Sequence, residues 1–221
     1  MADDSFIREV NEEIRKDRAQ ALWDRFGPLA LGLAVLIVLG TALYVAYDAW
    51  ISNRANQSGD NFSQALTLAN EGKNDEALGA LAALEKDGYG AYPILARMRA
   101  ATVLEAKGDF KGSVAGFDAV AADSAIPMSI RDMANLRAAL VLVDNGTYAE
   151  VASRVEPLTA DTNALRHSAR EALGLAAWKE ARAADALKLF DQIKDDQAAP
   201  RNLRERAILM AELIRGSGDA S

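Results

Sequence analysis

The stretch "ATVLEAKGDFKGSVAGF", residues 101–117, predicts two helices joined by a short turn. Alanine and other apolar residues occur at helical spacing on both sides of Lys107-Gly108-Asp109-Phe110. A glycine that follows one helical pattern and precedes another is typical of the left-handed residue that ends a helix. We therefore expect an antiparallel helical hairpin, with Gly108 at the turn.

The same turn pattern recurs along the chain. Gly72 and Gly146 lie 36 residues before and 38 residues after Gly108, and Ala181 takes the fourth place 35 residues further on. A small residue lies seven positions before each turn: Ala65, Ala101, Ala139 and Gly174. A small residue there lets the two helices of a hairpin approach closely. Proline occurs near the ends of the units, at Pro93, Pro127 and Pro200.

Apolar residues also recur after each turn, at six, nine and twelve positions. The three rows are Leu78, Val114, Ala152 and Leu187; Leu81, Phe117, Val155 and Phe190; and Leu84, Val120, Leu158 and Ile193. These positions fall on one face of a helix. Chance periodicity in an alanine-rich chain is the alternative, but four registers agree across four units. The sequence therefore predicts an all-α array of about four degenerate hairpins.

An uncharged run, "FGPLALGLAVLIVLGTALYVAY", occupies residues 26–47. As a helix it reaches about 33 Å, enough for a hydrocarbon core of about 30 Å. Trp23 and Phe26 at one end, with Tyr44, Tyr47 and Trp50 at the other, are typical of interfacial belts. A cleaved signal peptide and a buried helix of a soluble protein are the alternatives. We expect a permanent transmembrane helix, since a signal peptide has a shorter apolar region and a small-residue cleavage site.

Basic residues near the span predict its orientation. Arg15, Lys16, Arg18 and Arg25 precede it, whereas only Arg54 follows it before Lys73. The side richer in Lys and Arg stays in the cytoplasm, so the large C-terminal part should lie in the periplasm. The expected divisions are a cytoplasmic tail (1–25), the anchor (26–47), a linker (48–60), a repeat domain (61–215) and a disordered C-terminal tail (216–221).

Composition limits the function further. The net charge of −7 argues against binding to nucleic acid, which needs clustered Lys and Arg. The chain has no cysteine, which fits an oxidising compartment and excludes thiolate catalysis. His167 is its only histidine, expected at the surface or between helices, and Asp195-Asp196 is expected to be solvated charge. Because phosphate-binding and dinucleotide motifs are also absent, we expect no enzyme, cofactor, metal or small-molecule substrate.

These repeats resemble the tetratricopeptide repeat, whose period is near 34 residues. Ala65, Gly72 and Ala77 match its spacing of small residues, and Phe110 matches the usual aromatic residue at the turn. Ser113 and Val151 replace the alanine of the second helix, and Ala181 replaces the turn glycine. The repeats are therefore degenerate.

The opening "FIREVNEEIRKDRAQALWDRFG", residues 6–27, followed by one anchor and such repeats, resembles the YfgM-like family of bacterial inner-membrane proteins. That resemblance implies a periplasmic domain beside the SecYEG translocon, working with the chaperone PpiD on secreted proteins. A scaffold for another envelope machine, in cell-wall, outer-membrane or cytochrome assembly, has the same layout and stays the alternative.

By family analogy, the positions three, six and ten residues before each turn line the inner face of the array. The predicted protein-binding face is Met98, Thr102, Glu105, Leu136, Leu140, Val143, Glu171, Leu175 and Trp178, and the first unit adds Phe62, Leu66 and Ala69. A largely apolar face suits an amphipathic helix or an unfolded hydrophobic segment. We expect Leu140, Val143, Leu175 and Trp178 at its centre. The alternative is that a neighbouring helix, 201–215, covers them as core.

The tail before the anchor has its own apolar spacing, in Phe6, Ile7, Val10, Ile14, Ala21 and Leu22. This spacing indicates an amphipathic helix that lies against the membrane or a partner's cytoplasmic face. Arg18 interrupts the stripe, so a solvated helix or a disordered tail stays open.

Overall fold

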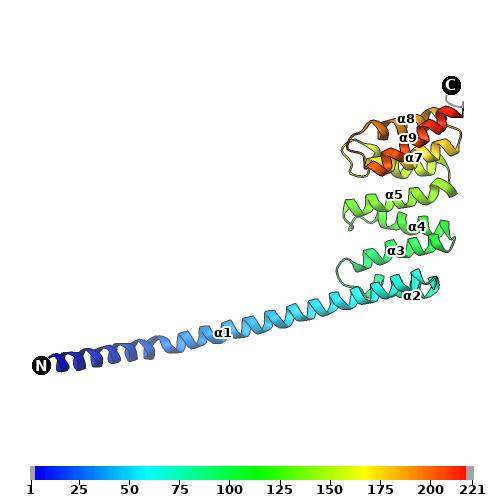
Figure 1. Ribbon diagram of the computed structural model, residues 1–221. Coiled ribbons are helices and arrows are strands. Elements are labelled where there is room, and N and C mark those ends of the chain that lie inside the picture. The colour runs from blue at the N-terminus through cyan, green and yellow to red at the C-terminus, as the bar shows by residue number, and fades with distance from the viewer. Residues whose placement is uncertain (1–2, 218–221) are drawn as a thin grey trace. The chain divides into compact units, whose positions relative to one another are not determined.

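The computed structural model describes residues 3–217. Met1, Ala2 and residues 218–221 lie outside the described part, as do the side chains of residues 3–11, Ala19 and Ala30. Every element within the described residues is a helix, which confirms the predicted all-α class (Figure 1). The elements are α1 (Asp3–Asn70), α2 (Asn74–Asp87), α3 (Tyr92–Ala106), α4 (Phe110–Ala122), α5 (Met128–Asn145), α6 (Tyr148–Val155), the 3₁₀ helix η1 (Glu156–Thr159), α7 (Arg166–Lys179), α8 (Ala183–Asp195) and α9 (Arg201–Gly216).

The chain divides into two compact units, residues 1–54 (unit 1) and 55–221 (unit 2). Helix α1 begins in unit 1 and ends in unit 2, and it runs without a break through the predicted linker, 48–60. The division of the chain into tail, anchor, linker, periplasmic domain and C-terminal tail stays a prediction.

Unit 1 carries the apolar run on an exposed helix. Every residue from 31 to 50 is exposed, and the helix is long and apolar enough to cross a membrane. A cation lies over an aromatic ring at each end: Arg25 is 5.5 Å from the Phe26 ring centre, and Arg54 is 5.2 Å from that of Trp50. The Trp50 ring also stacks on Tyr47. Aromatic and basic side chains thus pair at both ends of the apolar run.

The amphipathic stripe predicted in the tail falls partly outside the described side chains. Phe6, Ile7 and Val10 are among those not described, whereas Ile14, Ala21 and Leu22 are exposed. A contact of this stripe with a membrane or a partner stays a prediction.

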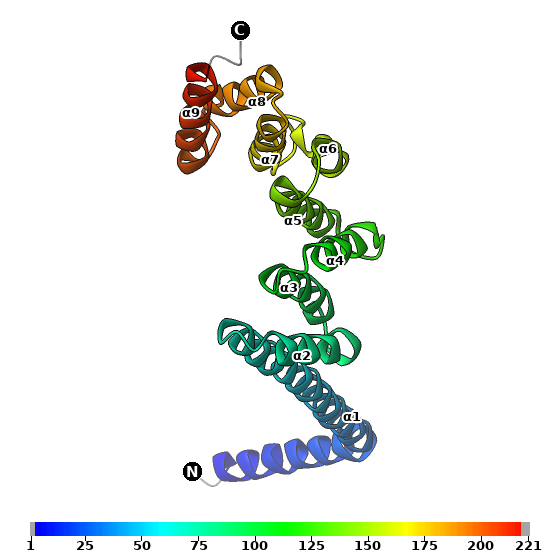
Figure 2. The ribbon, with the colours of Figure 1, turned by 90° about the vertical axis from the view of Figure 1, so that its right-hand side faces the viewer.

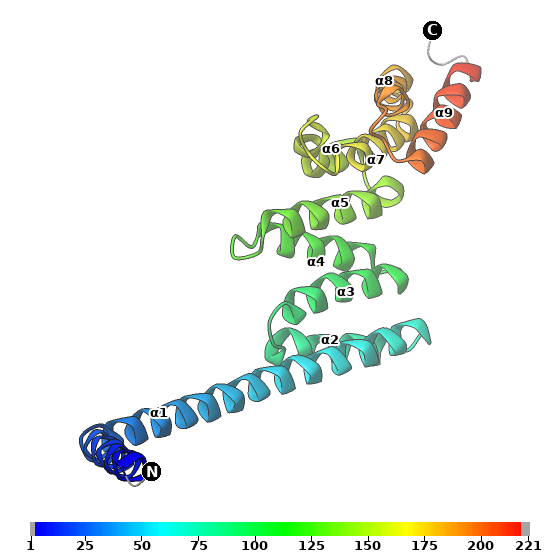
Figure 3. The same cartoon turned by 60° about the vertical axis from the view of Figure 1, so that its left-hand side comes forward.

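Unit 2 contains four helical hairpins and a final single helix (Figures 1 and 3). The first helices of the hairpins are the end of α1, α3, α5 and α7, and the second helices are α2, α4, α6 and α8. Figure 2 shows the end of α1, α3, α5 and α7 in one layer and α2, α4 and α6 in the other, whereas α8 lies above α7. On the side of the first helices, α9 and the end of α1 stand further out than α3 and α5, so this layer forms the inner face of a shallow curve.

Three of the four turns have the same backbone. Gly72, Gly108 and Ala181 have left-handed φ values of 76°, 82° and 57°. After each of them, an amide reaches back five residues: Lys73 N–H to Leu68 O, Asp109 N–H to Leu104 O and Arg182 N–H to Ala177 O, all at 2.9 Å. This is the Schellman pattern of a helix end. It confirms that Ala181 occupies the place of the turn glycines.

The turn at Gly146 differs from the other three, so the left-handed conformation predicted there is wrong. Its φ is −131°, which is an extended backbone. A Cβ atom at this position would lie 2.6 Å from Leu142 Cδ2. A side chain here would therefore have to displace Leu142, whereas any residue adopts this φ. Thr147 then begins α6 with a capping box, since its side chain and that of Glu150 bond each other's backbone amides.

The core faces of the second helices follow the predicted rows, with one correction. The residues nine and twelve positions after each turn are buried, whereas those six positions after are only half-buried. The fifth position is fully buried instead, at Ala77, Ser113, Val151 and Ala186. With about 100° per residue, the fifth position points between the ninth and the twelfth, and the sixth lies about 60° outside them.

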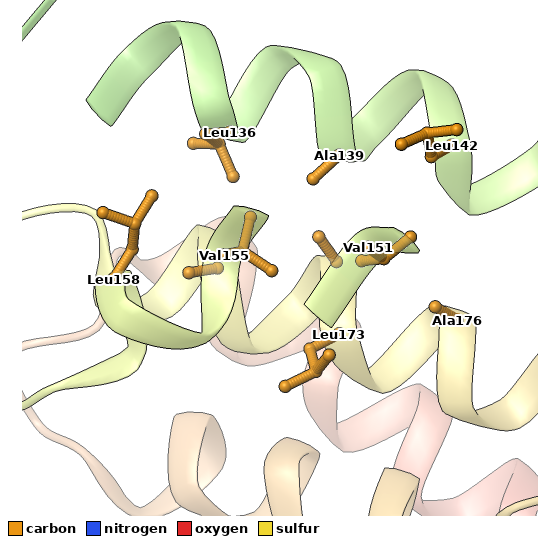
Figure 4. Close-up of a cluster of buried hydrophobic side chains, with 10 residues drawn as sticks. Leu136, Ala139, Leu142, Val151, Val155, Leu158, Leu173 and Ala176 are labelled. Atoms are coloured by element: carbon orange, nitrogen blue, oxygen red, sulfur yellow. The ribbon is translucent and has the colours of Figure 1, made fainter. Parts of the chain in front are cut away.

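The small residue before each turn is buried where two helices meet. A Cβ atom at Gly174 would lie 3.0–3.3 Å from atoms of the Phe190 ring, nine positions after the same turn. Figure 4 shows Ala139 of α5 between Leu136 and Leu142, facing Val151 and Val155 of α6. The predicted close approach within a hairpin is therefore confirmed.

Candidate protein-binding face

The nine residues of the predicted binding face lie on α3, α5 and α7, three helices of the inner layer (Figure 2). Their exposure is uneven. Leu140 is 41% exposed, whereas Leu136 is only 4% exposed and the other seven are half-buried. Leu140 is thus the most accessible of the predicted apolar residues.

Leu136 belongs to the core and not to an accessible surface, which corrects its assignment to the face. It packs in the cluster that joins α5, α6 and α7, where Figure 4 shows it beside Leu158 and Val155. Val143 packs against the edge of the same cluster. Met98 packs against two clusters formed by α3, α4 and α5. These three side chains therefore lie in or beside the core and offer little surface to a partner.

The polar residues of the face pair with arginines. Arg137 Nη2 lies 3.8 Å from Glu105 Oε2 and 3.4 Å from Thr102 Oγ1, which links α5 to α3. Arg206 of α9 makes two hydrogen bonds to Glu171 of α7, at 2.7 and 2.8 Å. Both predicted acids thus have a basic partner within the fold, with the closer contact at Glu171.

Helix α9 covers part of the face on α7. Leu175 and Trp178 pack against a cluster that includes Ala207, Ala211 and Ile214 of α9. The covering helix considered from the sequence is therefore present at the fourth hairpin. Trp178 contributes to the packing of α7, α8 and α9, so its truncation to alanine would act on folding as well as on any partner.

The comparison with known families agrees with this geometry. The family model of the tetratricopeptide repeat-like domain matches residues 20–186. The chain belongs to this family. No curated protein and no solved structure matches the chain.

The tetratricopeptide repeat-like match covers the apolar span and the hairpins as far as the first turn of α8. Stacked helical hairpins present an extended inner surface to other proteins, and this fold is typically a non-enzymatic interaction scaffold. The match does not extend to a YfgM-like member, a translocon or a chaperone.

Four exposed apolar residues, two of the inner layer and two of α9 beside it, were not predicted. Leu95 and Met133 lie thirteen positions before their turn glycines, one helical turn beyond the predicted row. Leu209 and Leu213 of α9 are 66% and 56% exposed. They lie three and seven residues after Arg206, on the same side of α9, and Arg206 bonds the inner-face residue Glu171. Extending the same spacing to the position thirteen residues before each turn, and to residues 201–215, would have found these four residues.

His167 lies between helices, which is one of the two places expected for it. Asp196, in contrast, is not the free solvated charge that the sequence predicted. His167 is buried at the start of α7, with Nε2 2.7 Å from Asp196 Oδ2 after α8. Arg166 also bonds this carboxylate, at 3.0 and 3.2 Å. The hydrogen bond with His167, together with those from the Ala198 amide and Arg166, lowers the pKa of Asp196. Asp196 therefore ties α7 to the α8–α9 connection rather than being free solvated charge.

Proposed function

We propose that the protein is a membrane-anchored, non-enzymatic subunit whose repeat domain binds apolar segments of other proteins in the periplasm. Within that role, we propose that it is an ancillary subunit of the SecYEG translocon that works with a PpiD-like chaperone on secreted proteins. Its anchor would be residues 26–47 in the inner membrane, with the N-terminus in the cytoplasm.

The exposed apolar side chains of the inner layer carry this proposal. Leu95, Met133 and Leu140 are about two-fifths exposed, and Leu209 and Leu213 are more than half exposed. Large exposed apolar patches mark interaction sites, and we propose that these side chains form one. An apolar row along several helices suits an unfolded segment or an amphipathic helix.

The anchor supports the placement beside a membrane. The exposed apolar side chains between residues 31 and 50 would face lipid, and the cation–aromatic contacts at Phe26 and Trp50 would lie at its two interfaces. The excess of Lys and Arg before the span favours a cytoplasmic N-terminus. The absence of cysteine fits a periplasmic domain.

The translocon role rests on the resemblance of residues 6–27, the single span and the repeats to the YfgM-like family. Crosslinking in native membranes, followed by mass spectrometry of the proteins attached to the full chain, tests it. SecY and a periplasmic chaperone should be recovered. Recovery of cell-wall synthases, outer-membrane assembly factors or haem-handling proteins alone would overturn the translocon role and favour the scaffold alternative.

Paired variants in the same experiment test the inner face. Leu140→Asp combined with Leu213→Asp should lower the recovery of the chaperone and of secreted proteins at least fivefold, because charge is introduced into the apolar row. Met128→Asp is the control for a charge placed on an exposed apolar residue elsewhere, since Met128 is exposed but lies at the start of α5. Unchanged recovery with the double variant would show that the inner face is not the binding surface.

A further inference from the structure

Neighbouring turns of unit 2 are linked by charged side chains at two of their three junctions. At the junction of the third and fourth turns, Lys179 Nζ donates to the carbonyl oxygens of Val143, Asp144 and Gly146 at 3.0, 2.7 and 3.1 Å. Val143 and Asp144 lie in the last turn of α5 and Gly146 follows it, where backbone acceptors lack helical partners. The lysine therefore caps the helix of the preceding hairpin.

Two more contacts close the same junction. Glu180 Oε1 accepts a hydrogen bond from the Tyr148 amide at 2.7 Å. The Arg182 guanidinium lies 3.7 Å from the centre of the Tyr148 ring. At the junction of the first and second turns, Lys107 Nζ pairs with Asp75. Both of these junctions are thus bridged by side chains of the chain itself.

Within the described residues, no charged side chain links the second and third turns. Asp144 and Asn145 precede Gly146, so no cation occupies the place that Lys107 and Lys179 take beside their turns. Asn145 Nδ2 instead donates to Val141 O of its own helix, at 2.8 Å. A hollow of about 550 Å³ lies at this junction, between the start of α4 and the end of α5. We call it the turn pocket.

The turn pocket has an apolar part built from two hairpins. Val114 of α4 and Leu142 of α5 line it, and both pack against or within the core behind it. Phe110, the aromatic residue of the second turn, also lines the pocket and is 40% exposed. An apolar side chain of ordinary size would be enclosed on several sides here, which a flat surface does not provide.

Charged groups also line the turn pocket, with carboxylates in excess. Asp109 and Glu150 are its acids, and Lys111 is its one cation among the described lining residues. Asp109 Oδ1 accepts from the Gly112 amide at 2.9 Å, and Glu150 Oε2 accepts from the Thr147 amide at 2.8 Å. In the described part of the chain, Asp109 Oδ2 and Glu150 Oε1 accept no hydrogen bond. Each carboxylate is thus held in place with one oxygen left for a donor.

We propose that the turn pocket binds a segment of a partner protein in which an apolar side chain is followed by Lys or Arg. The apolar side chain would pack on Phe110, Val114 and Leu142, and the cation would pair with Asp109 and Glu150. Charge complementarity favours this occupant, because two carboxylates and one ammonium group line the turn pocket and the whole chain has a net charge of −7. The site is separate from the inner face of the proposed function.

Fluorescence anisotropy with three labelled ten-residue peptides tests the proposal on the full chain in detergent micelles. The peptides are Gly/Ser sequences with a central Phe-Arg, Phe-Glu or Ala-Arg pair. The Phe-Arg peptide should bind at least tenfold more tightly than the other two, since only it supplies both the apolar side chain and the cation. Equal affinities, or no binding of the Phe-Arg peptide, would overturn the proposal.

A double variant that keeps both helix caps locates the binding. Asp109→Asn with Glu150→Gln preserves the capping acceptors but removes both charges, so the affinity for the Phe-Arg peptide should fall at least fivefold. Asp87→Asn with Glu212→Gln, at exposed positions on α2 and α9, makes the same change in net charge and should have no effect. Leu140→Asp with Leu213→Asp should also leave peptide binding unchanged. Wild-type affinity in the first double variant, with thermal unfolding unchanged, would show that the pocket is not the site.

Discussion

Replacing Phe190 by alanine is expected to lower the free energy of unfolding of unit 2 by about 3–5 kcal/mol. Phe190 is fully buried in the cluster that joins α7, α8 and α9. Its ring lies against Gly174, which has no side chain that could move into the space left by the ring. The variant should therefore leave a cavity, and the loss is a large fraction of the stability of an ordinary domain, about 5–15 kcal/mol.

Urea unfolding of residues 51–221, followed by circular dichroism, measures this change. We expect this fragment to be soluble and mostly helical without the anchor. Phe110→Ala is the matched control, since Phe110 is 40% exposed at a turn, and it should cost about 1 kcal/mol or less. Similar losses for the two variants would contradict the packing of the fourth hairpin.

Replacing Ala139 by phenylalanine is expected to cost about 1–3 kcal/mol, by overpacking rather than by leaving a cavity. Ala139 is fully buried on α5 and faces Val151 and Val155 of α6 (Figure 4). A ring at this position would force α5 and α6 apart. The same urea titration measures the effect.

Ala115→Phe supplies the control for that substitution. Ala115 lies in the middle of α4 but is exposed, so a ring there can extend into solvent. Its cost should be limited to the difference in helix propensity, about 0.5 kcal/mol. Full stability of Ala139→Phe would refute the close contact between the helices of the third hairpin.

The fold was predictable because the turns and the buried helix faces of each repeat depend on residues that are close in the sequence. The turns at Gly72 and Gly108 need a left-handed residue, and glycine adopts that conformation at little cost. The rows that contain Phe117 and Phe190 repeat the spacing of a buried helix face. Alignment of the four units even placed Ala181, an alanine in a left-handed conformation.

Features that depend on neighbouring hairpins were less predictable. Gly146 matches the other turns in sequence, but contact with Leu142 determines its role. Leu136 lies in the predicted inner row, yet packing between α5 and α6 buries it. Asp196 was assigned to solvent because its partners Arg166 and His167 are about 30 residues away in the chain. The sequence spacing carries no information on such contacts.

The binding face was predictable in part for the same reason. The inner row follows from the register of the first helices, and Leu140 is accessible there. Helix α9 then covers Leu175 and Trp178 and adds Leu209 and Leu213 to the exposed apolar surface. The centre of the proposed face therefore moves from Trp178 toward Leu140 and the end of α9.

Protease protection in intact spheroplasts tests most directly the central claim, that residues 26–47 hold the repeat domain in the periplasm. The full chain would carry an epitope tag at each end. Added protease should digest residues 51–221 and leave the N-terminal tag intact until the membrane is permeabilised. Protection of the repeat domain in intact spheroplasts, or a mature protein that begins near residue 50, would contradict the account.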